Sequence, residues 1–398
     1  MISRDGVELA DIIREFGTPY RKTKKLPLHF LKVMNAIEKC RTSLLGGHVD
    51  ECDSCGYVKI SYNSCRNRHC PKCQSLAKEE WLIKRKQELL PVTYFHVVFT
   101  IPDLLNPLVL VNQKIMYGIL FKAAAETLIT LGKDRKHLGA DIGLITILHT
   151  WGQNLSDHPH LHCVVPGGGL LEDGSKWIYP KKSKKNKKFF IHVNIISDLF
   201  KKKFLFYLKR SYQNNTLKFE GKIKSLVDNK HFKNLLDQLY TKRWVSYCKS
   251  PFGGPEQVLE YLGRYTHRVA ISNNRIQKIE NGRVFFTFKD YRDGDKVKET
   301  SLEVFEFIRR FLQHVLPQEF FKIRYYGILS SRNKKNKLER CRQILGTSNN
   351  QEESEKIDWR QLILKLFGID PAICPKCKNG LLCRVEELIP VRIAAAPT

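Results

Sequence analysis

The chain has 398 residues, and its 68 lysines and arginines against 40 aspartates and glutamates give a formal net charge of +28. A hydrophobic content of 42% and an aromatic content of 11% exclude a disordered polycation. No run of about 18 uncharged apolar residues predicts a membrane span, and the N-terminus lacks the layout of a secretory signal. We expect a globular, cytoplasmic protein of about two or three domains with a polyanionic partner and no membrane.

The first half of the chain predicts helices interleaved with strands. Apolar residues at helical spacing predict a helix over 26–45. A charged helix is expected after Cys73 and ends at about residue 90, because Pro91 breaks it. A β-branched alternating segment predicts a strand over 93–101. An apolar helix follows over 106–131, and a strand over 142–151 is expected to pair with 160–165.

The second half predicts a surface loop, further helices and a hairpin. The lysine-rich segment 176–188 is expected to be a solvated loop. A helix over 195–212, a strand over 244–248 and a helix that begins near Pro255 follow. Two alternating segments flank Asp293 and Gly294, which is typical of a hairpin with a tight turn. The polar segment 346–356 predicts a linker to a small C-terminal piece.

Cysteines in two clusters indicate metal binding. Two Cys-x-x-Cys pairs are separated by fourteen residues near the N-terminus, and tetrahedral zinc requires four ligands where one turn supplies two. The sequence therefore predicts a structural zinc ion bound by Cys52, Cys55, Cys70 and Cys73.

Three nearby residues, His48, Cys65 and His69, are secondary candidates. They would either contribute to a second zinc ion or lie buried around the first. Such a module would present Arg66, Arg68 and Lys72 to DNA.

The remaining cysteines are less informative. At the C-terminus Cys374, Cys377 and Cys383 lack an evident fourth ligand, so a zinc ion there stays an open alternative. Four isolated cysteines are expected to be small apolar residues of the core, namely Cys40, Cys163, Cys248 and Cys341.

A His-x-His pattern predicts a second kind of metal site. On a strand, His160 and His162 project from one face while Leu161 and Cys163 enter the core. Two imidazoles can then bind one divalent ion. Gln153 is expected across a hairpin as the third ligand, with His158 as the alternative. A polar strand face without a metal is the competing interpretation.

A tyrosine pair lies on the helix that begins near Pro255. Tyr261 and Tyr265 are four residues apart, so a helix places them on one face, and Arg264 and Arg268 flank them. Taken alone, such a pair is more often part of an aromatic core.

Together these motifs resemble the two-tyrosine rolling-circle transposases, the HUH endonucleases of insertion-sequence-91 type. The resemblance covers most of the chain and includes the segments 63–74, 148–169, 251–272, 288–294 and 307–317. His160-Leu161-His162 corresponds to the His-hydrophobe-His motif that gives the HUH group its name, and Tyr261 and Tyr265 correspond to the two tyrosines.

The resemblance implies an α+β protein with an HUH endonuclease fold, whose central antiparallel sheet is flanked by helices, and a small zinc-ribbon-like N-terminal domain. We expect a helical and zinc-binding DNA-recognition domain over 1–92 and the endonuclease domain over 93–343. A linker over 344–356 and a small C-terminal piece with a helix and a Cys-x-x-Cys segment over 357–398 complete the expected organisation.

The implied function is that of a bacterial insertion-sequence transposase. It would nick single-stranded DNA with Mg²⁺ or Mn²⁺ at His160, His162 and Gln153 and transfer strands through 5′-phosphotyrosine intermediates at Tyr261 and Tyr265. Arg264 and Arg268 would contact the DNA and favour the ionised phenol. No nucleotide cofactor is expected, because the chain has no G-x-x-x-x-G-K-[ST] motif.

The expected partners are single-stranded or hairpin-shaped element ends, a host helicase and the host replication machinery, with the protein associated with the bacterial nucleoid. The basic segments 181–188 and 332–342 would add phosphate contacts. The alternatives are a plasmid rolling-circle replication initiator, a relaxase, or a non-catalytic zinc-dependent DNA-binding protein. The order of the motifs, with His160 ahead of Tyr261, disfavours a relaxase.

Overall fold

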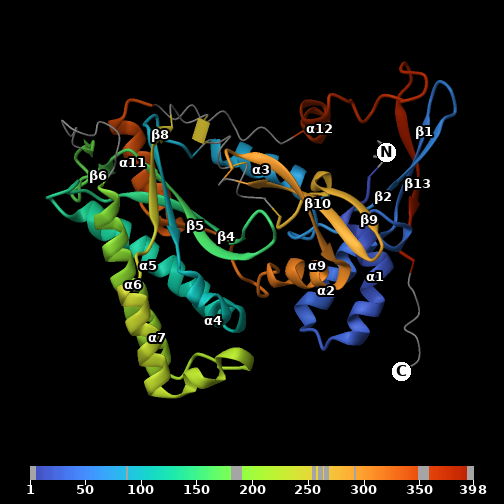
Figure 1. Cartoon of the computed structure of the whole chain (residues 1–398). Coiled ribbons are helices and arrows are strands. Elements are labelled where there is room, and N and C mark those ends of the chain that lie inside the picture. The colour runs from blue at the N-terminus through green and yellow to red at the C-terminus, as the bar shows by residue number, and fades with distance from the viewer. Residues whose placement is uncertain are drawn as a thin grey trace. The chain divides into compact units, whose positions relative to one another are not determined.

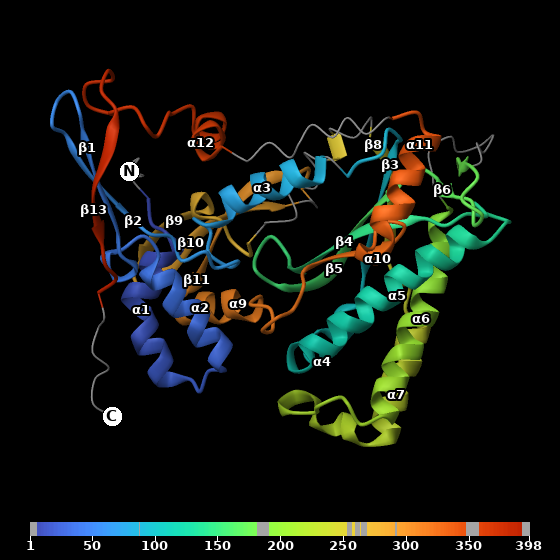
Figure 2. The ribbon, with the colours of Figure 1, turned by 180° about the vertical axis from the view of Figure 1, so that it is seen from behind.

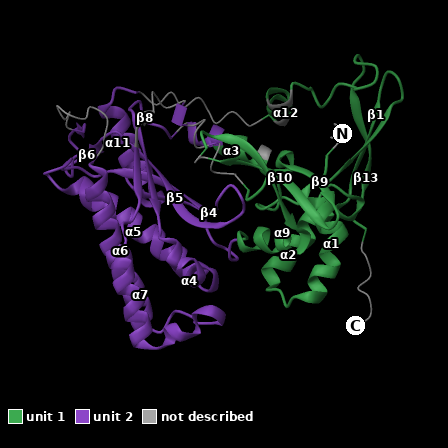
Figure 3. Ribbon diagram, viewed as in Figure 1, with its two compact units in different colours: residues 1–81, 267–315, 350–398 green, residues 82–266, 316–349 purple. Residues whose placement is uncertain are grey.

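The computed structural model describes residues 6–86, 88–180, 191–252, 257–258, 263, 269–290, 293–347 and 358–391. The chain divides into two compact units (Figure 1, Figure 3). Unit 1 contains residues 1–81, 267–315 and 350–398, and unit 2 contains residues 82–266 and 316–349. These units differ from the sequence-based domains, because the segment 93–343 contributes to both and the two ends of the chain share unit 1.

Unit 2 is built on a five-stranded antiparallel sheet. The strand order is β12-β4-β5-β3-β8, so β5 is the central strand. The strands are β3 (Tyr94–Thr100), β4 (Gly143–Trp151), β5 (Asp157–Pro166), β8 (Ser246–Phe252) and β12 (Ile323–Gly327). Two short strands, β6 (Gly169–Leu170) and β7 (Trp177–Ile178), form a separate pair. The sequence predicted the β4–β5 hairpin correctly.

Helices cover one face of this sheet, with α5 and α6 side by side (Figure 2). Leu161 and Cys163 of β5 and Val97 and Phe99 of β3 point into this core. Because side chains alternate along a strand, the neighbouring residues of β3 and β5 lie on the opposite face. The helices of unit 2 are α4 (Asn106–Val111), α5 (Gln113–Lys133), α6 (Val193–Gln213), α7 (Asn229–Thr241), α10 (Ser331–Asn333) and α11 (Glu339–Ile344).

The apolar segment predicted as one helix over 106–131 is two helices, α4 and α5, divided at Asn112. The buried Asn112 amide donates to the carbonyls of Leu108 and Lys218, and its oxygen accepts from the Lys218 amide. Helix α5 is long and apolar enough to cross a membrane by length and composition alone, but 67% of its apolar window is buried inside the protein. It is the central core helix of unit 2, and the same length and composition are common in such helices.

Unit 1 contains a three-stranded meander packed with helices. Strands β9 (Ile276–Glu280), β10 (Arg283–Asp290) and β11 (Lys296–Glu303) pair antiparallel, which confirms the predicted hairpin. Helix α9 (Val304–Gln313) follows and contacts α1 (Leu9–Thr23), where Tyr20 meets Phe305 edge to face with ring centroids 5.4 Å apart. Helix α2 (Leu28–Lys39) packs on α1 and ends earlier than the predicted residue 45.

A second sheet in unit 1 joins the two ends of the chain. Its order is β13-β1-β2, with β1 (Gly47–Cys52) in the middle, β2 (Val58–Tyr62) on one side and β13 (Leu382–Leu388) on the other. Helix α3 (Gln74–Lys86) follows the N-terminal cysteines, and α12 (Trp359–Phe367) precedes the C-terminal ones. The C-terminal segment is therefore part of the N-terminal module rather than a separate piece.

Candidate metal centres

The His-x-His motif lies on β5, the central strand of the unit 2 sheet. Leu161 and Cys163 are fully buried in the core, whereas His160 and His162 lie on the opposite face, as the alternation predicted. The ring centroids of His160 and His162 are 4.9 Å apart. The strand geometry therefore gathers both imidazoles at one place.

A third imidazole, that of His149, completes this site from the neighbouring strand. In the β4–β5 register His149 is directly opposite His160, so the two side chains share a face. One ring nitrogen from each of His149, His160 and His162 lies within 4.8 Å of the others. We call these three residues the histidine cluster.

His149 is not among the site residues predicted from the sequence. The sequence nevertheless contains a signal for this residue, because His149 lies in the segment LHTW, two residues before Trp151, at the end of a predicted strand. Only the hairpin register shows that it faces His160, because a shift of one residue would turn it to the core.

Hydrogen bonds orient two of the imidazoles. Nδ1 of His160 lies 2.6 Å from the carbonyl oxygen of His158, so it donates there and leaves Nε2 for a metal. Nδ1 of His162 lies 2.9 Å from Nε2 of His96 on β3, and both side chains are buried. Hydrogen bonds of this kind fix the tautomer of metal-binding histidines.

The donor set fits a divalent cation. The three nitrogens lie so close together that small rotations of the rings would place each of them at about 2.0–2.1 Å from one ion, the usual length of a metal–imidazole bond. The histidine cluster contains no carboxylate. An ion bound there would keep its double positive charge for an anionic ligand, and nitrogen ligands favour Mn²⁺ over Mg²⁺.

Gln153 occupies a different position from the one expected. It lies in the loop between β4 and β5, whereas the residue opposite His160 is His149. The His158 ring is exposed, and its centroid is 4.9 Å from that of His160.

The predicted tyrosine pair and its arginines fall in a part of the chain that the structure does not describe. Tyr261, Arg264, Tyr265 and Arg268 lie outside the described residues, as does the lysine tract 181–188. Near the pair, the structure describes residues 257, 258 and 263, and these three are helical.

Four cysteines of unit 1 form a first sulfur cluster, composed of Cys40, Cys65, Cys70 and Cys73. Its sulfur–sulfur distances are 3.6 Å for Cys40–Cys73 and Cys65–Cys73 and 3.7 Å for Cys40–Cys70. Sulfurs bound at about 2.3 Å to a tetrahedral zinc ion lie about 3.8 Å apart. The cluster therefore fits one zinc ion.

Four other cysteines form a second sulfur cluster, composed of Cys52, Cys55, Cys374 and Cys377. The distances Cys52–Cys377 and Cys55–Cys374 are both 3.7 Å. The Gly380 amide donates to the Cys377 sulfur at 3.3 Å. This hydrogen bond, together with those from the Asn379 amide and from the Cys52 and Cys55 thiols, lowers the pKa of the Cys377 thiol to about 6. Cys383 is exposed on β13 and is not a member of this cluster.

The predicted zinc set of Cys52, Cys55, Cys70 and Cys73 is thus divided between two clusters. The reason is tertiary, because each Cys-x-x-Cys pair finds its partners elsewhere in the chain. Cys40, which the sequence predicted to be a small apolar residue of the core, belongs to the first sulfur cluster. Hydrogen bonds from Cys65 and Cys70 lower the pKa of its thiol to about 7. Burial instead raises the pKa of Cys163, which is a core residue as expected.

The secondary candidates have different environments. Cys65 belongs to the first sulfur cluster. Among the residues that the structure describes, neither His48 nor His69 belongs to a cluster that could bind a metal ion. Nε2 of His48 lies 3.3 Å from a carboxylate oxygen of Asp50.

The three expected DNA contacts near the first cluster also differ from one another. Arg66 and Arg68 are exposed between Cys65 and Cys70, while the Lys72 ammonium pairs with the Glu8 carboxylate.

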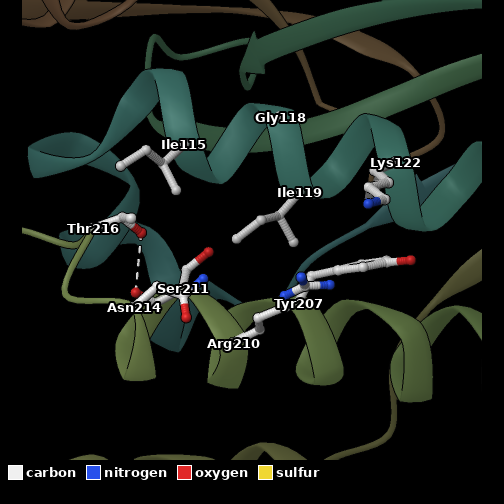
Figure 4. Close-up of a pocket in the computed structure, with 9 residues that line it drawn as sticks. All are labelled: Ile115, Gly118, Ile119, Lys122, Tyr207, Arg210, Ser211, Asn214 and Thr216. Carbon is white, nitrogen blue, oxygen red and sulfur yellow. Dashed lines mark hydrogen bonds between the residues drawn. The ribbon is translucent and has the colours of Figure 1, made fainter.

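A separate pocket of about 370 Å³ lies between α5 and α6 (Figure 4). The Lys122 ammonium lies 4.3 Å from the ring centroid of Tyr207, and the Tyr207 hydroxyl donates to Glu126. Burial and this hydrogen bond raise the pKa of Tyr207 to about 12. The pocket contains none of the residues selected from the sequence, and we assign it no role.

Comparison with known proteins gives a consistent result. Residues 143–337 match a family described as "Putative transposase", and residues 12–101 match the family "Transposase zinc-binding domain". The chain is 48% identical over 388 residues to "Putative transposase y4qJ" of Sinorhizobium fredii, which covers 97% of this chain and 96% of the relative. It is 28% identical over 345 residues to "Transposase for insertion sequence element IS801" of Pseudomonas savastanoi pv. phaseolicola, covering 85% and 79%. No solved structure matches the chain.

Proposed function

Because the chain belongs to the transposases of insertion-sequence-91 type, we propose that it nicks and rejoins single-stranded DNA through tyrosine during rolling-circle transposition of an insertion sequence. The observation that supports the chemistry is the histidine cluster. Its three imidazoles, on adjacent strands, form a site that suits a divalent cation and an anionic ligand.

The cation, which we propose to be Mn²⁺ or Mg²⁺, would be bound by His149, His160 and His162. Such an ion withdraws charge from phosphate oxygens and fixes a phosphodiester for in-line attack. The protein supplies the orientation of the ligands. The His158 carbonyl holds the His160 ring, and His96 holds the His162 ring. We propose His149 as the third ligand in place of Gln153.

The nucleophile is a phenol of the tyrosine pair, Tyr261 or Tyr265. Its oxygen attacks the phosphorus and loses its proton, a new P–O bond forms, and the bond to the 3′ oxygen breaks. The 5′ phosphate stays on tyrosine, and the leaving 3′ oxygen takes up a proton to become a hydroxyl that can prime replication. Rejoining reverses these bonds, so no nucleotide is consumed. Arg264 and Arg268 would favour the ionised phenol.

We propose that DNA is the partner and that the zinc-stabilised module recognises it. The zinc-binding family match spans all four cysteines of the first sulfur cluster. The exposed Arg66 and Arg68 lie between two of them, where they would contact phosphates of single-stranded or hairpin-shaped element ends. Strand separation and synthesis would come from a host helicase and the replication machinery, in the cytoplasm at the nucleoid.

The test is adduct formation on labelled single strands that span the ends of the element encoding the chain. We expect a denaturation-resistant 5′-phosphate adduct with Mn²⁺, no adduct after chelation, and none for the double variant Tyr261→Phe/Tyr265→Phe. Tyr247→Phe is the matched control. Val98 is opposite Tyr247 on one side and His162 on the other, so Tyr247 lies on the same face of the sheet as His162. It should keep full adduct formation. An adduct in the double variant, or DNA binding without any cleavage, would overturn the proposal.

A further inference from the structure

The second sulfur cluster is made of two turns with the same local geometry. In the N-terminal turn the Gly56 amide donates to the Cys52 carbonyl at 3.1 Å, and in the C-terminal turn the Lys378 amide donates to the Cys374 carbonyl at 3.0 Å. Gly56 and Lys378, which each follow the second cysteine of their turn, have φ of 66° and 64°. Two turns of one geometry, 319 residues apart between Cys55 and Cys374, face each other.

In each turn, the backbone amide of the first cysteine also donates a hydrogen bond to the carbonyl of a residue beyond the second cysteine. The Cys52 amide donates to the Tyr57 carbonyl at 3.0 Å, and the Cys374 amide donates to the Gly380 carbonyl at 2.8 Å. Such turns hold two thiols of a Cys-x-x-Cys pair on one side, which is the arrangement that supplies half of a tetrahedral zinc site.

Hydrogen bonds between the turns hold the two pairs of sulfurs together. The Leu381 amide donates to the Asp53 carboxylate at 2.8 Å, and the Asp53 amide donates to the Leu381 carbonyl at 3.1 Å. Gly380 lies so close to the N-terminal turn that a Cβ atom at this position would be 2.4 Å from the Cys52 sulfur. The close approach of the two turns therefore depends on a residue without a side chain.

The sulfur positions have the spacing of a bound ion and not of disulfides. The 3.7 Å distances Cys52–Cys377 and Cys55–Cys374 are close to the edge of about 3.8 Å expected around tetrahedral zinc, and a disulfide bond would be about 2.05 Å long. We infer that Cys52, Cys55, Cys374 and Cys377 bind a second structural zinc ion that fastens the C-terminal segment of the chain to its N-terminal module.

This second zinc site changes the boundary of the zinc-binding module. The family match over 12–101 contains Cys52 and Cys55 but neither of their C-terminal partners. Strand β13 begins at Leu382, directly after the C-terminal turn, and pairs with β1 over its whole length. Without β13, β1 would pair only with β2 and would become an edge strand of the sheet. The module is therefore complete only when both ends of the chain are present. The inference is independent of the activity proposed for the histidine cluster.

Metal content of the purified full-length chain tests the inference. We measure zinc and iron per chain by elemental analysis, because four thiolates also suit iron. Compared with the parent, Cys374→Ser/Cys377→Ser should lose about one zinc ion per chain, and Cys52→Ser/Cys55→Ser should lose the same ion. The quadruple variant should lose no more than either double variant, since all four residues share one site. Cys383→Ser, which changes an exposed cysteine on β13, is the matched control and should lose nothing.

Alkylation of the parent chain avoids the question of whether the variants fold. Before chelation, Cys383 should react with iodoacetamide, while Cys374 and Cys377 should be protected together with Cys52 and Cys55; after chelation all five should react. Unchanged zinc in Cys374→Ser/Cys377→Ser, loss of two ions in the quadruple variant, iron in place of zinc, or immediate alkylation of Cys374 and Cys377 would each overturn the inference.

Discussion

The Nε2 atom of His96 lies 2.9 Å from the Nδ1 atom of His162, and the two ring planes are within 6° of parallel, with centroids 5.1 Å apart. If His162 binds a metal through Nε2, its Nδ1 carries the proton and donates it to His96. In that case His96 would be a positioning residue, which fixes the tautomer and the direction of the His162 ring from a neighbouring strand.

Replacing His96 should therefore weaken metal binding more than it weakens the fold. We expect His96→Ala to raise the Mn²⁺ dissociation constant about 10–100-fold, measured by calorimetry. His96→Gln, whose amide oxygen can accept the same hydrogen bond, should recover part of the affinity. Equal affinities for the parent and His96→Ala, or no recovery with glutamine, would show that His96 only fills space.

Replacing His149 and replacing Gln153 should have different effects on adduct formation. Because His149 faces His160 across the β4–β5 pair, His149→Ala should abolish Mn²⁺-dependent adduct formation, while Gln153→Ala in the loop should keep most of it. The comparison uses one labelled strand and a series of Mn²⁺ concentrations. The reverse result would restore the glutamine as the third ligand and exclude the imidazole.

Cys40 tests the first sulfur cluster, because the sequence suggested an apolar role and the structure places its sulfur 3.6 Å from that of Cys73. We expect Cys40→Ser to lose about one zinc ion per chain and to lower the melting temperature, since structural zinc contributes directly to folding. Cys341→Ser is the matched control, as Cys341 is equally buried but belongs to no described cluster. It should keep all its zinc; full zinc in Cys40→Ser would count against the cluster.

The pH dependence of stability should reveal the carboxylate of Glu306. Hydrogen bonds from Arg309 and Arg310 lower the pKa of Glu306 to about 2, below the unfolded value of about 4.3. A lowered carboxyl pKa stabilises the folded state above the unfolded pKa, and this contribution is lost as the pH falls from about 4.3 to about 2.

Glu306→Gln should consequently lower the free energy of unfolding by about 0.5–1 kcal/mol at neutral pH, since the ion pairs are partly exposed. The difference from the parent should narrow below about pH 4.3 in urea titrations. Glu280→Gln, which removes an exposed ion pair with Lys278 in the same unit, should have a smaller effect. A difference that widens in acid would contradict the assigned sign.

Gly327 ends β12 beside the strand that carries His149, with φ of 63° and with its would-be Cβ only 1.8 Å from the Ile142 carbonyl oxygen. We expect Gly327→Ala to cost about 2–3 kcal/mol of unfolding free energy. Gly174→Ala has a similar φ of 70° in the same unit and open space around it, so only the backbone cost of about 1–2 kcal/mol applies. Equal losses in denaturant titrations would show that the steric contact is relieved.

Several elements of the fold could be read from local patterns. The alternation in 93–101 predicted β3, a strand over 142–151 was also predicted correctly as β4, and the Asp-Gly turn predicted the β10–β11 hairpin, because these signals are properties of consecutive residues. The break at Asn112 was missed, since its amide is satisfied by Lys218, a residue about a hundred positions away. Similarly, no local signal indicates that the segment after the linker returns to pair with β1.

By itself the sequence determined the parts that depend on neighbouring residues. His160 and His162 share a face because side chains alternate, and each Cys-x-x-Cys pair presents two thiols because a tight turn requires it. The tertiary structure alone decided which parts meet. The sheet register brings His149 and His96 to the His-x-His motif, and the pairing of β13 with β1 brings Cys374 and Cys377 to Cys52 and Cys55. The physical reason is that a metal site needs atoms within a few ångströms, whereas contacts between distant segments follow from strand pairing and core packing over the whole unit.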